Sequence, residues 1–257
     1  MEKFLIIPDL CDIETSLSIA GKYGFGFEYN DFYIPDILDD EEKAEEYIKT
    51  YKSRTLPSNC TLHGAFFDVI VFSSDRRIRE TAELRIRQSL DIARRIGAKG
   101  VVFHTNHSPQ LTSESYINGW HKRNAEFWSS ILPEYSDIDI YMENMFDSSP
   151  DMLARLASEL SSFSNFGVCL DYAHAEVFGG GADRWVETLA PYVKHVHIND
   201  NDLKDDLHLA VGDGKIDWKK FAGYYNRYFR DCTVLIEVNG AEKQERSAEF
   251  LKEIGLI

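Results

Sequence analysis

The sequence has few of the features that mark several classes of protein. Its 257 residues include four cysteines, which lie far apart and form no CxxC pair. No apolar run approaches the roughly 20 residues that a membrane-spanning helix needs. The N-terminal segment also lacks an apolar stretch long enough for a secretory signal. From these absences we expect a cytoplasmic protein with reduced thiols and no membrane role.

Basic residues are scarce as well. Lys and Arg together number 28 against 43 Asp and Glu, and the formal net charge is -15. Such a charge opposes non-specific attraction to a polyanion, although it leaves room for a local basic patch. The one basic cluster, Arg76, Arg77 and Arg79, could equally cap a helix or hold a sugar phosphate. The composition therefore argues against nucleic acid as a partner.

No linker or low-complexity segment divides the chain, so we expect one domain over residues 1–257. Short apolar runs alternate with segments of helical periodicity. The predicted strands are 4–7, 25–30, 61–66, 100–104, 139–144, 167–174, 193–200 and 233–239. The predicted helices are 13–23, 39–51, 78–96, 115–132, 150–160, 184–189, 218–229 and 242–254.

This alternation predicts the α/β class and a single (β/α)8 TIM barrel with right-handed crossovers. The alternative is an open, doubly wound sheet. A nucleotide-binding sheet of that kind needs a glycine-rich turn after its first strand, and the segment from Pro8 to Cys11 contains no glycine. The sequence therefore favours the closed barrel.

Acidic or imidazole side chains end several of the predicted strands. The active site of such a barrel lies where the strands end, and residues two apart share a face. Counting back in twos, Glu143, Asp171 and Glu237 point inward, where they would repel one another without a cation. The candidates that should converge there are His63, His104, Glu143, Asp171, His174, His197, Asp206, His208 and Glu237.

This mixture of imidazole and carboxylate suits zinc, manganese, cobalt or iron better than calcium or magnesium. We expect one to three divalent ions per chain, most simply zinc, manganese or cobalt. His195 and Cys169 should fill the barrel interior, His107 should lie in a loop and His121 on a helix surface. The aromatic residues expected near the mouth could pack on a sugar or simply cover the barrel; they are Phe32, Tyr33, Phe66, Phe67 and Phe178.

Together these motifs resemble the xylose isomerase-like barrel superfamily over essentially the whole chain. That superfamily joins sugar and sugar-phosphate isomerases and epimerases with abasic-site nucleases of the endonuclease IV type. The motifs that carry the resemblance are Gly167-Val168-Cys169-Leu170-Asp171-x-x-His174, His197-x-Asn199-Asp200, Asp206-x-His208, Gly212-Asp213-Gly214-Lys215-Ile216-Asp217-Trp218 and Leu235-Ile236-Glu237.

The isomerase and epimerase branch implies one metal, and the positions that match its ligands are Glu143, Asp171, His197 and Glu237. The resemblance further implies that Glu143 and Glu237 form a proton-transfer pair. It implies that His174 binds the substrate close to the metal. The full set of expected substrate-binding residues is His63, His104, His174, Phe66 and Lys204.

The nuclease branch implies three zinc ions, and its additional ligands match His63, His104, His174, Asp206 and His208. The chain departs from the nuclease pattern at residues 175–180, at Phe66 and at Asp68. We therefore expect a metal-dependent isomerase or epimerase that acts on a small sugar or sugar phosphate. The alternatives are an endonuclease IV-like zinc phosphodiesterase and a non-catalytic, metal- and sugar-binding barrel. A homo-oligomer stays open.

Overall fold

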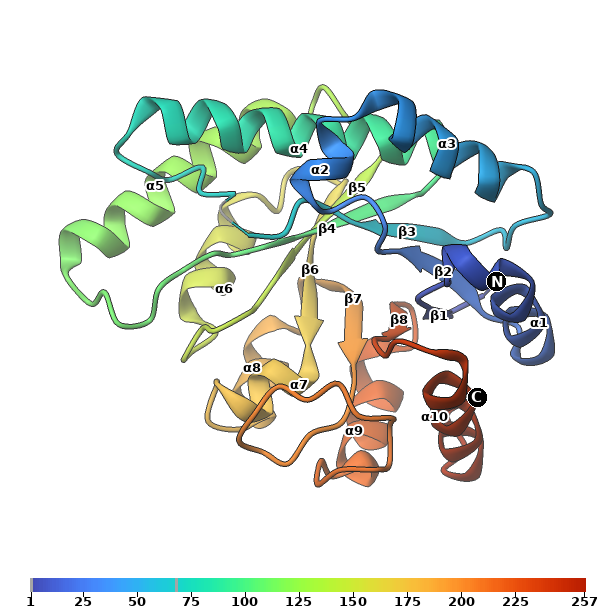
Figure 1. Cartoon of the computed structure of the whole chain (residues 1–257). Coiled ribbons are helices and arrows are strands. Elements are labelled where there is room, and N and C mark those ends of the chain that lie inside the picture. The colour runs from blue at the N-terminus through green and yellow to red at the C-terminus, as the bar shows by residue number, and fades with distance from the viewer. Residues whose placement is uncertain (1, 68) are drawn as a thin grey trace.

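The computed structural model describes residues 2–67 and 69–257, and its centre is a closed barrel of parallel strands (Figure 1). Each strand pairs with the next along the chain, and β1 pairs with β8 to close the barrel. This confirms the predicted (β/α)8 barrel. The strands are β1 (Phe4–Ile6), β2 (Gly26–Tyr29), β3 (Cys60–His63), β4 (Gly100–His104), β5 (Asp139–Glu143), β6 (Phe166–Asp171), β7 (Val193–Ile198) and β8 (Thr233–Ile236).

Helices follow the strands and surround the barrel (Figure 1). The α-helices are α1 (Ile13–Tyr23), α2 (Pro35–Leu38), α3 (Glu41–Lys52), α4 (Arg76–Ile96), α5 (Glu114–Ile131), α6 (Asp151–Glu159), α7 (Tyr172–Val177), α8 (Ala182–Leu189), α9 (Trp218–Tyr224) and α10 (Ala241–Glu253). A 3-10 turn lies at Leu10–Asp12, and α9 continues as a π-helical segment at Tyr225–Phe229. Among the described residues, no helix has both the length and the apolar character needed to cross a bilayer.

The predicted strand over 167–174 is wrong in its second half. The strand β6 ends at Asp171, and α7 begins at the next residue. The side chain of Asp171 accepts a hydrogen bond from the backbone N–H of His174 at 2.7 Å, which is the N-cap interaction that starts a helix. One carboxylate oxygen of Asp171 therefore caps α7, and the other remains free for the barrel mouth.

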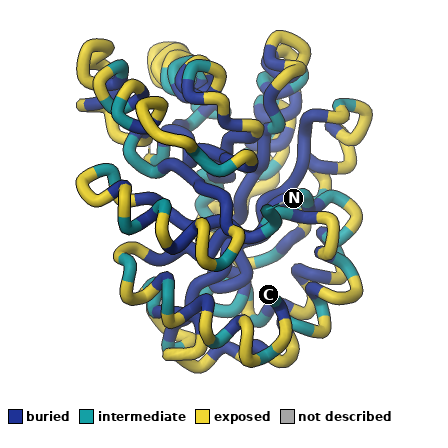
Figure 2. Tube along the Cα trace, turned by 90° about the vertical axis from the view of Figure 1, so that its right-hand side faces the viewer, coloured by how far each residue is buried: buried dark blue, intermediate teal, exposed yellow. Residues whose placement is uncertain are grey.

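Side chains alternate along each strand between the barrel interior and the helices. Val102, Tyr141 and Cys169 form one small interior cluster, and Leu5, Ile7 and Leu235 form another. The residues between them join the large core under the helices, which appears as the buried interior in Figure 2. The predicted inward face is therefore confirmed, and so is the interior position of His195, whose ring stacks on Tyr141 at 5.3 Å.

Candidate metal centre

Four side chains from neighbouring strands meet at the C-terminal end of the barrel. Glu143 ends β5, Asp171 ends β6, His197 lies near the end of β7, and Glu237 follows β8 directly. Each of them offers one ligand atom, and these atoms all lie within 4.8 Å of one another. All four residues are buried. The sequence prediction that these residues converge is therefore met in the folded chain, and we call them the central group.

The polar atoms of the central group are not satisfied by the protein. Glu143 Oε2, Asp171 Oδ2, His197 Nδ1 and Glu237 Oε2 are buried and have no hydrogen-bond partner among the described residues. Leaving such groups unpaired away from water is strongly unfavourable. One oxygen from each of three carboxylates and one imidazole nitrogen form a ligand set that suits zinc or manganese. The residues present therefore fit a divalent cation.

The charges of the central group point the same way. Burial raises the pKa of the Asp171 carboxyl to about 8, and Glu237 and Glu143 add to that rise. Burial also opposes the charge of Glu143, but His197 and His104 outweigh burial and hold its pKa well below the usual range. Without a cation the group thus keeps a proton on Asp171. A divalent cation would favour the ionised form instead.

Two further groups flank the central one. His63 Nε2 and His104 Nε2 lie 3.7 Å and 3.3 Å from Glu143 Oε2, so Glu143 belongs to both this flanking group and the central group. On the other side, Asp206 Oδ2 lies 3.3 Å from His174 Nε2 and 3.2 Å from His208 Nε2. All nine residues expected at the mouth are therefore present in three adjoining groups.

Backbone carbonyls orient three of these imidazoles. His63 Nδ1 lies 3.0 Å from the oxygen of Gly64, His174 Nδ1 lies 2.9 Å from that of Asn144, and His208 Nδ1 lies 2.9 Å from that of Glu237. A carbonyl only accepts, so each Nδ1 carries a proton, and Nε2 is the nitrogen that can bind a cation once it has no proton. The fold therefore presents Nε2 of all three rings toward the carboxylates.

The comparison with known families agrees with the fold and the site. A family model described as "Xylose isomerase-like TIM barrel" matches residues 19–254. The chain belongs to the xylose isomerase-like TIM barrel family. This match confirms the resemblance drawn from the strand-end motifs, because it covers nearly the whole barrel and includes all nine residues.

Proteins of similar sequence carry different names. The chain is 29% identical over 203 residues to the "Uncharacterized protein MJ1311" of Methanocaldococcus jannaschii, covering 75% of this chain and 68% of that protein. It is 28% identical over 164 residues to the "Probable endonuclease 4" of Mycobacterium leprae, covering 57% and 61%. It is 28% identical over 154 residues to the "Fructoselysine 3-epimerase" of Escherichia coli O157:H7, covering 55% and 53%.

Solved structures share the fold at lower sequence identity. A Thermus thermophilus protein named TTHB071, soaked with zinc chloride, superposes with a TM-score of 0.80 and 23% identity, and the match covers 98% of both chains. A D-tagatose 3-epimerase-like protein gives a TM-score of 0.78 at 23% identity, covering 98% of this chain and 96% of that one. At this identity the likeness concerns the barrel itself.

The structure also places three further residues for which the sequence made predictions. Phe66 lies beside the flanking group, with its ring 5.4 Å from that of His63 and 4.5 Å from that of His104. Lys204 is exposed, and its ammonium group makes no hydrogen bond or ion pair with the described residues. The surface position predicted for His121 is wrong, because its ring is buried beside α6, with Nε2 3.1 Å from Glu159 Oε2.

Sequence reasoning assigned no role to two residues that build the site. Asn144 pairs with the backbone of Asp171 in both directions, accepting from its N–H at 3.0 Å and donating to its oxygen at 2.9 Å. The fully buried Asp200 shapes the loop that carries Asp206 and His208. Its carboxylate accepts hydrogen bonds from the backbone N–H groups of Asn201, Gly212 and Ile216 and from the indole of Trp218. The motif His197-x-Asn199-Asp200 contained Asp200, and an acid at the end of a predicted strand was the available signal for its role.

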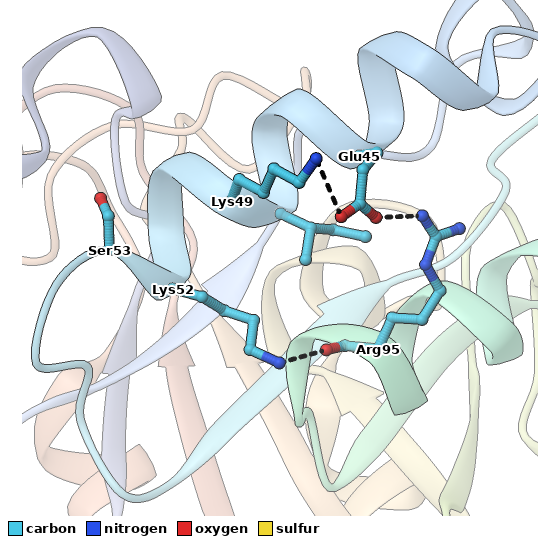
Figure 3. A pocket seen from close by; sticks show the side chains of 6 residues that line it. Glu45, Lys49, Lys52, Ser53 and Arg95 are labelled. Carbon is cyan, nitrogen blue, oxygen red and sulfur yellow. Dashed lines mark hydrogen bonds and ion pairs between the residues drawn. The ribbon is translucent and has the colours of Figure 1, made fainter.

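The surface pocket between α3 and α4 does not resemble the metal centre. Glu45, Lys49, Lys52 and Arg95 line it, and Figure 3 shows these side chains bonded among themselves. Glu45 pairs with Arg95 at 2.5 Å and with Lys49 at 3.6 Å, and Lys52 donates to the backbone oxygen of Arg95 at 3.1 Å. Glu45 therefore pairs with two cations of the pocket, and the ammonium group of Lys52 is bonded to a backbone oxygen.

Cation binding should depend on pH. Burial opposes the charge of His208, but Asp206 and Glu237 outweigh it and raise its pKa to about 10, while the pKa of Asp171 is about 8. Both groups are thus protonated at pH 7 in the cation-free protein and must lose protons to act as ligands. We expect zinc affinity to rise between pH 6 and 9 with release of at least one proton. Calorimetry in buffers of different ionisation enthalpy measures both quantities, and a flat profile would contradict the ligand assignment.

Proposed function

We propose that the protein is a divalent-metal-dependent isomerase or epimerase that acts on a small sugar or sugar phosphate. The observation that carries this proposal is the pair Glu143 and Glu237, which approach one small volume from β5 and β8. Each presents an unpaired, buried carboxylate oxygen there, and each has an oxygen 3.5 Å from His197 Nδ1. Two carboxylates flanking one position can remove and return a proton on a bound substrate.

In this proposal the cation is held by Glu143, Asp171, His197 and Glu237. When bound, it supplies Lewis acidity that polarises a substrate carbonyl and stabilises the negative charge that develops as the proton leaves. Glu143 is ionised, as its low pKa requires, and takes the proton from the carbon beside the carbonyl. Glu237 returns a proton on the other face. Burial opposes the charge of Glu237, but His197 and His208 outweigh burial and lower its pKa, so Glu237 takes up from water the proton that it then delivers. His174 hydrogen-bonds the sugar, and Phe66 packs against it.

The scarcity of cations around the mouth supports a small substrate over a polyanion. The segments that follow the C-terminal ends of the strands, up to the next helix, contain only two basic residues, Lys204 and Lys215. A protein that binds duplex DNA needs several basic side chains near the DNA phosphates. The names "Fructoselysine 3-epimerase" and "D-tagatose 3-epimerase-like protein" among the similar proteins agree with a sugar as the substrate.

A second candidate function is phosphodiester hydrolysis. The specific observation in its favour is the third group, in which His174, Asp206 and His208 lie at ligand distances beside the central group. A single-metal proton transfer does not require Asp206 and His208, whereas a site that holds several metal ions can clamp a phosphate. The similarity to a protein named "Probable endonuclease 4" points in the same direction. This candidate function requires a nucleic acid to bind at the barrel mouth, where few basic side chains are available to neutralise its phosphates.

One experiment separates the candidates. Metal content per chain is measured by elemental analysis on protein purified without chelator. The same preparation is incubated in D2O with D-tagatose, D-psicose, L-ribulose and fructoselysine, and with DNA that contains an abasic site. We expect about one metal per chain, exchange of a carbon-bound hydrogen by 1H NMR, and intact DNA. Two to three zinc ions with cleavage would favour the second candidate. Sugar binding without exchange would indicate a non-catalytic barrel, and absence of metal would refute both enzymes.

A further inference from the structure

His197 differs from the other imidazoles of the site in what lies behind its ring. The rings of His63, His174 and His208 have backbone carbonyls at Nδ1. The ring of His197 is reversed, with Nδ1 toward the central group and Nε2 toward the barrel interior. There Nε2 lies 3.1 Å from Glu28 Oε1, a carboxylate oxygen of β2. A negatively charged acceptor thus stands where the other rings have a neutral one.

Glu28 reaches His197 through the inside of the barrel. The strands β2 and β7 are separated by β1 and β8 in the closed sheet, and both side chains are fully buried. Glu28 Oε1 and His197 Nε2 form an ion-pair contact with each other, and neither atom has a hydrogen-bond partner among the described residues. An unpaired buried charge is strongly destabilising, so each of these two atoms depends on the other.

The second oxygen of Glu28 is held firmly. Glu28 Oε2 accepts a hydrogen bond from the Thr61 hydroxyl at 2.6 Å and lies 3.0 Å from His195 Nε2. His195 Nδ1 in turn lies 2.5 Å from the hydroxyl of Thr233, and its ring stacks on Tyr141. The simplest proton arrangement has His195 donating to Glu28 through Nε2 and accepting from Thr233 through Nδ1. The carboxylate therefore has a fixed place and orientation beneath His197.

From this geometry we propose that Glu28 is a positioning residue, which holds the proton of His197 on Nε2 so that Nδ1 faces the cation. A carboxylate accepts only, so it selects this tautomer and locks the ring. The inference rests on the metal centre of the proposed function, but it would apply equally to the epimerase and to the hydrolase. Glu28 lies beneath the ligands and belongs to none of the groups of converging ligand atoms among the described residues.

A different arrangement of the same residues provides the competing interpretation. Cys169, His195 and His197 also offer ligand atoms within 4.8 Å of one another. A cation bound there would use the lower side of His197 and compete with Glu28 for that nitrogen. The two arrangements predict different effects of substitutions, because only the lower cation would depend on Cys169.

The test compares zinc and cobalt binding by the wild-type protein, Glu28→Gln and Cys169→Ser. In Glu28→Gln the amide oxygen can still accept the hydrogen bonds from Thr61 and His195. In that orientation the amide N–H groups point toward His197. His197 Nε2 must then accept and Nδ1 carries the proton, which removes the ligand. We expect chelator competition to show a 10- to 100-fold loss of affinity and the visible spectrum of bound cobalt to change. Asp31→Asn, an acid-to-amide change where the partner is Tyr51, should leave both unchanged.

The outcomes are distinguishable. Wild-type protein that binds neither metal refutes the proposed metal centre itself. Metal binding by wild type with unchanged affinity and spectrum in Glu28→Gln overturns the role of Glu28. A loss of affinity in Cys169→Ser that equals or exceeds the loss in Glu28→Gln overturns it in favour of the lower site. If Glu28→Gln does not fold, 15N NMR of the histidine rings in zinc-loaded wild type decides: a proton on His197 Nε2 supports the proposal, and one on Nδ1 overturns it.

Discussion

Replacing Glu237 with glutamine is expected to lower the rate of epimerisation by about 10²- to 10⁴-fold, the range that general acid–base catalysis contributes. The substrate is whichever of the tested sugars the wild-type protein turns over. Glutamine has nearly the same shape and keeps an oxygen for the cation, but it cannot carry the proton to the substrate. The measurement is the rate of epimerisation in D2O, followed by 1H NMR, together with metal content per chain. We expect metal content close to that of the wild type, so that the loss is assigned to proton transfer.

The matched control is Glu242→Gln. Glu242 lies in the first turn of α10, five residues further along the chain, and its side chain is exposed. The Glu242→Gln protein should epimerise the sugar at the wild-type rate. Turnover near the wild-type rate in Glu237→Gln would exclude Glu237 as a proton-transfer group and leave it as a ligand only.

Asp171→Asn should have opposite effects on the cation-free and the zinc-loaded protein. The pKa of Asp171 is raised to about 8 in the fold, so its contribution to stability is present below the unfolded pKa near 4 and is lost as pH rises through about 8. Asparagine carries no charge and still accepts the capping hydrogen bond from His174. We therefore expect the unfolding free energy of cation-free Asp171→Asn to exceed that of cation-free wild type by on the order of 3 kcal/mol at pH 6, and by more at pH 8.

With zinc the order of the two proteins should reverse at pH 6. At a concentration of zinc 1,000 times its dissociation constant, the wild type gains about 4 kcal/mol of unfolding free energy. Asp171→Asn loses most of that gain because it lacks a ligand oxygen. Urea unfolding at pH 6, 7, 8 and 9, with zinc and with chelator, measures both effects. Asp40→Asn, which changes the exposed N-cap of α3, should respond to neither pH nor zinc in this way. An equal zinc gain in Asp171→Asn would contradict the central group.

Much of this site could be predicted from the sequence because the relevant signals are local. An apolar run followed at once by Glu143 or Asp171 defines both the strand and the place where its polar end lies. In a closed parallel barrel all strands end at one mouth, so side chains far apart in sequence converge there without any information on individual contacts. Side chains two apart share the inward face, so the position along the strand then separated Cys169 and His195, one layer deeper in the barrel, from Asp171 and His197 at the mouth.

The sequence by itself thus determined the barrel, the direction of its strands and the nine side chains at its mouth, since each follows from a pattern within a few residues. The tertiary structure alone decided how those side chains are held. Glu28 and His195 are 167 positions apart in the chain, and no period relates them. Asp200 and Asn144 act through backbone atoms that a sequence does not distinguish, and His121 is buried because α6 covers it. These contacts depend on which elements meet across the closed barrel. The residue pattern within one strand or helix does not indicate which distant residues will contact it.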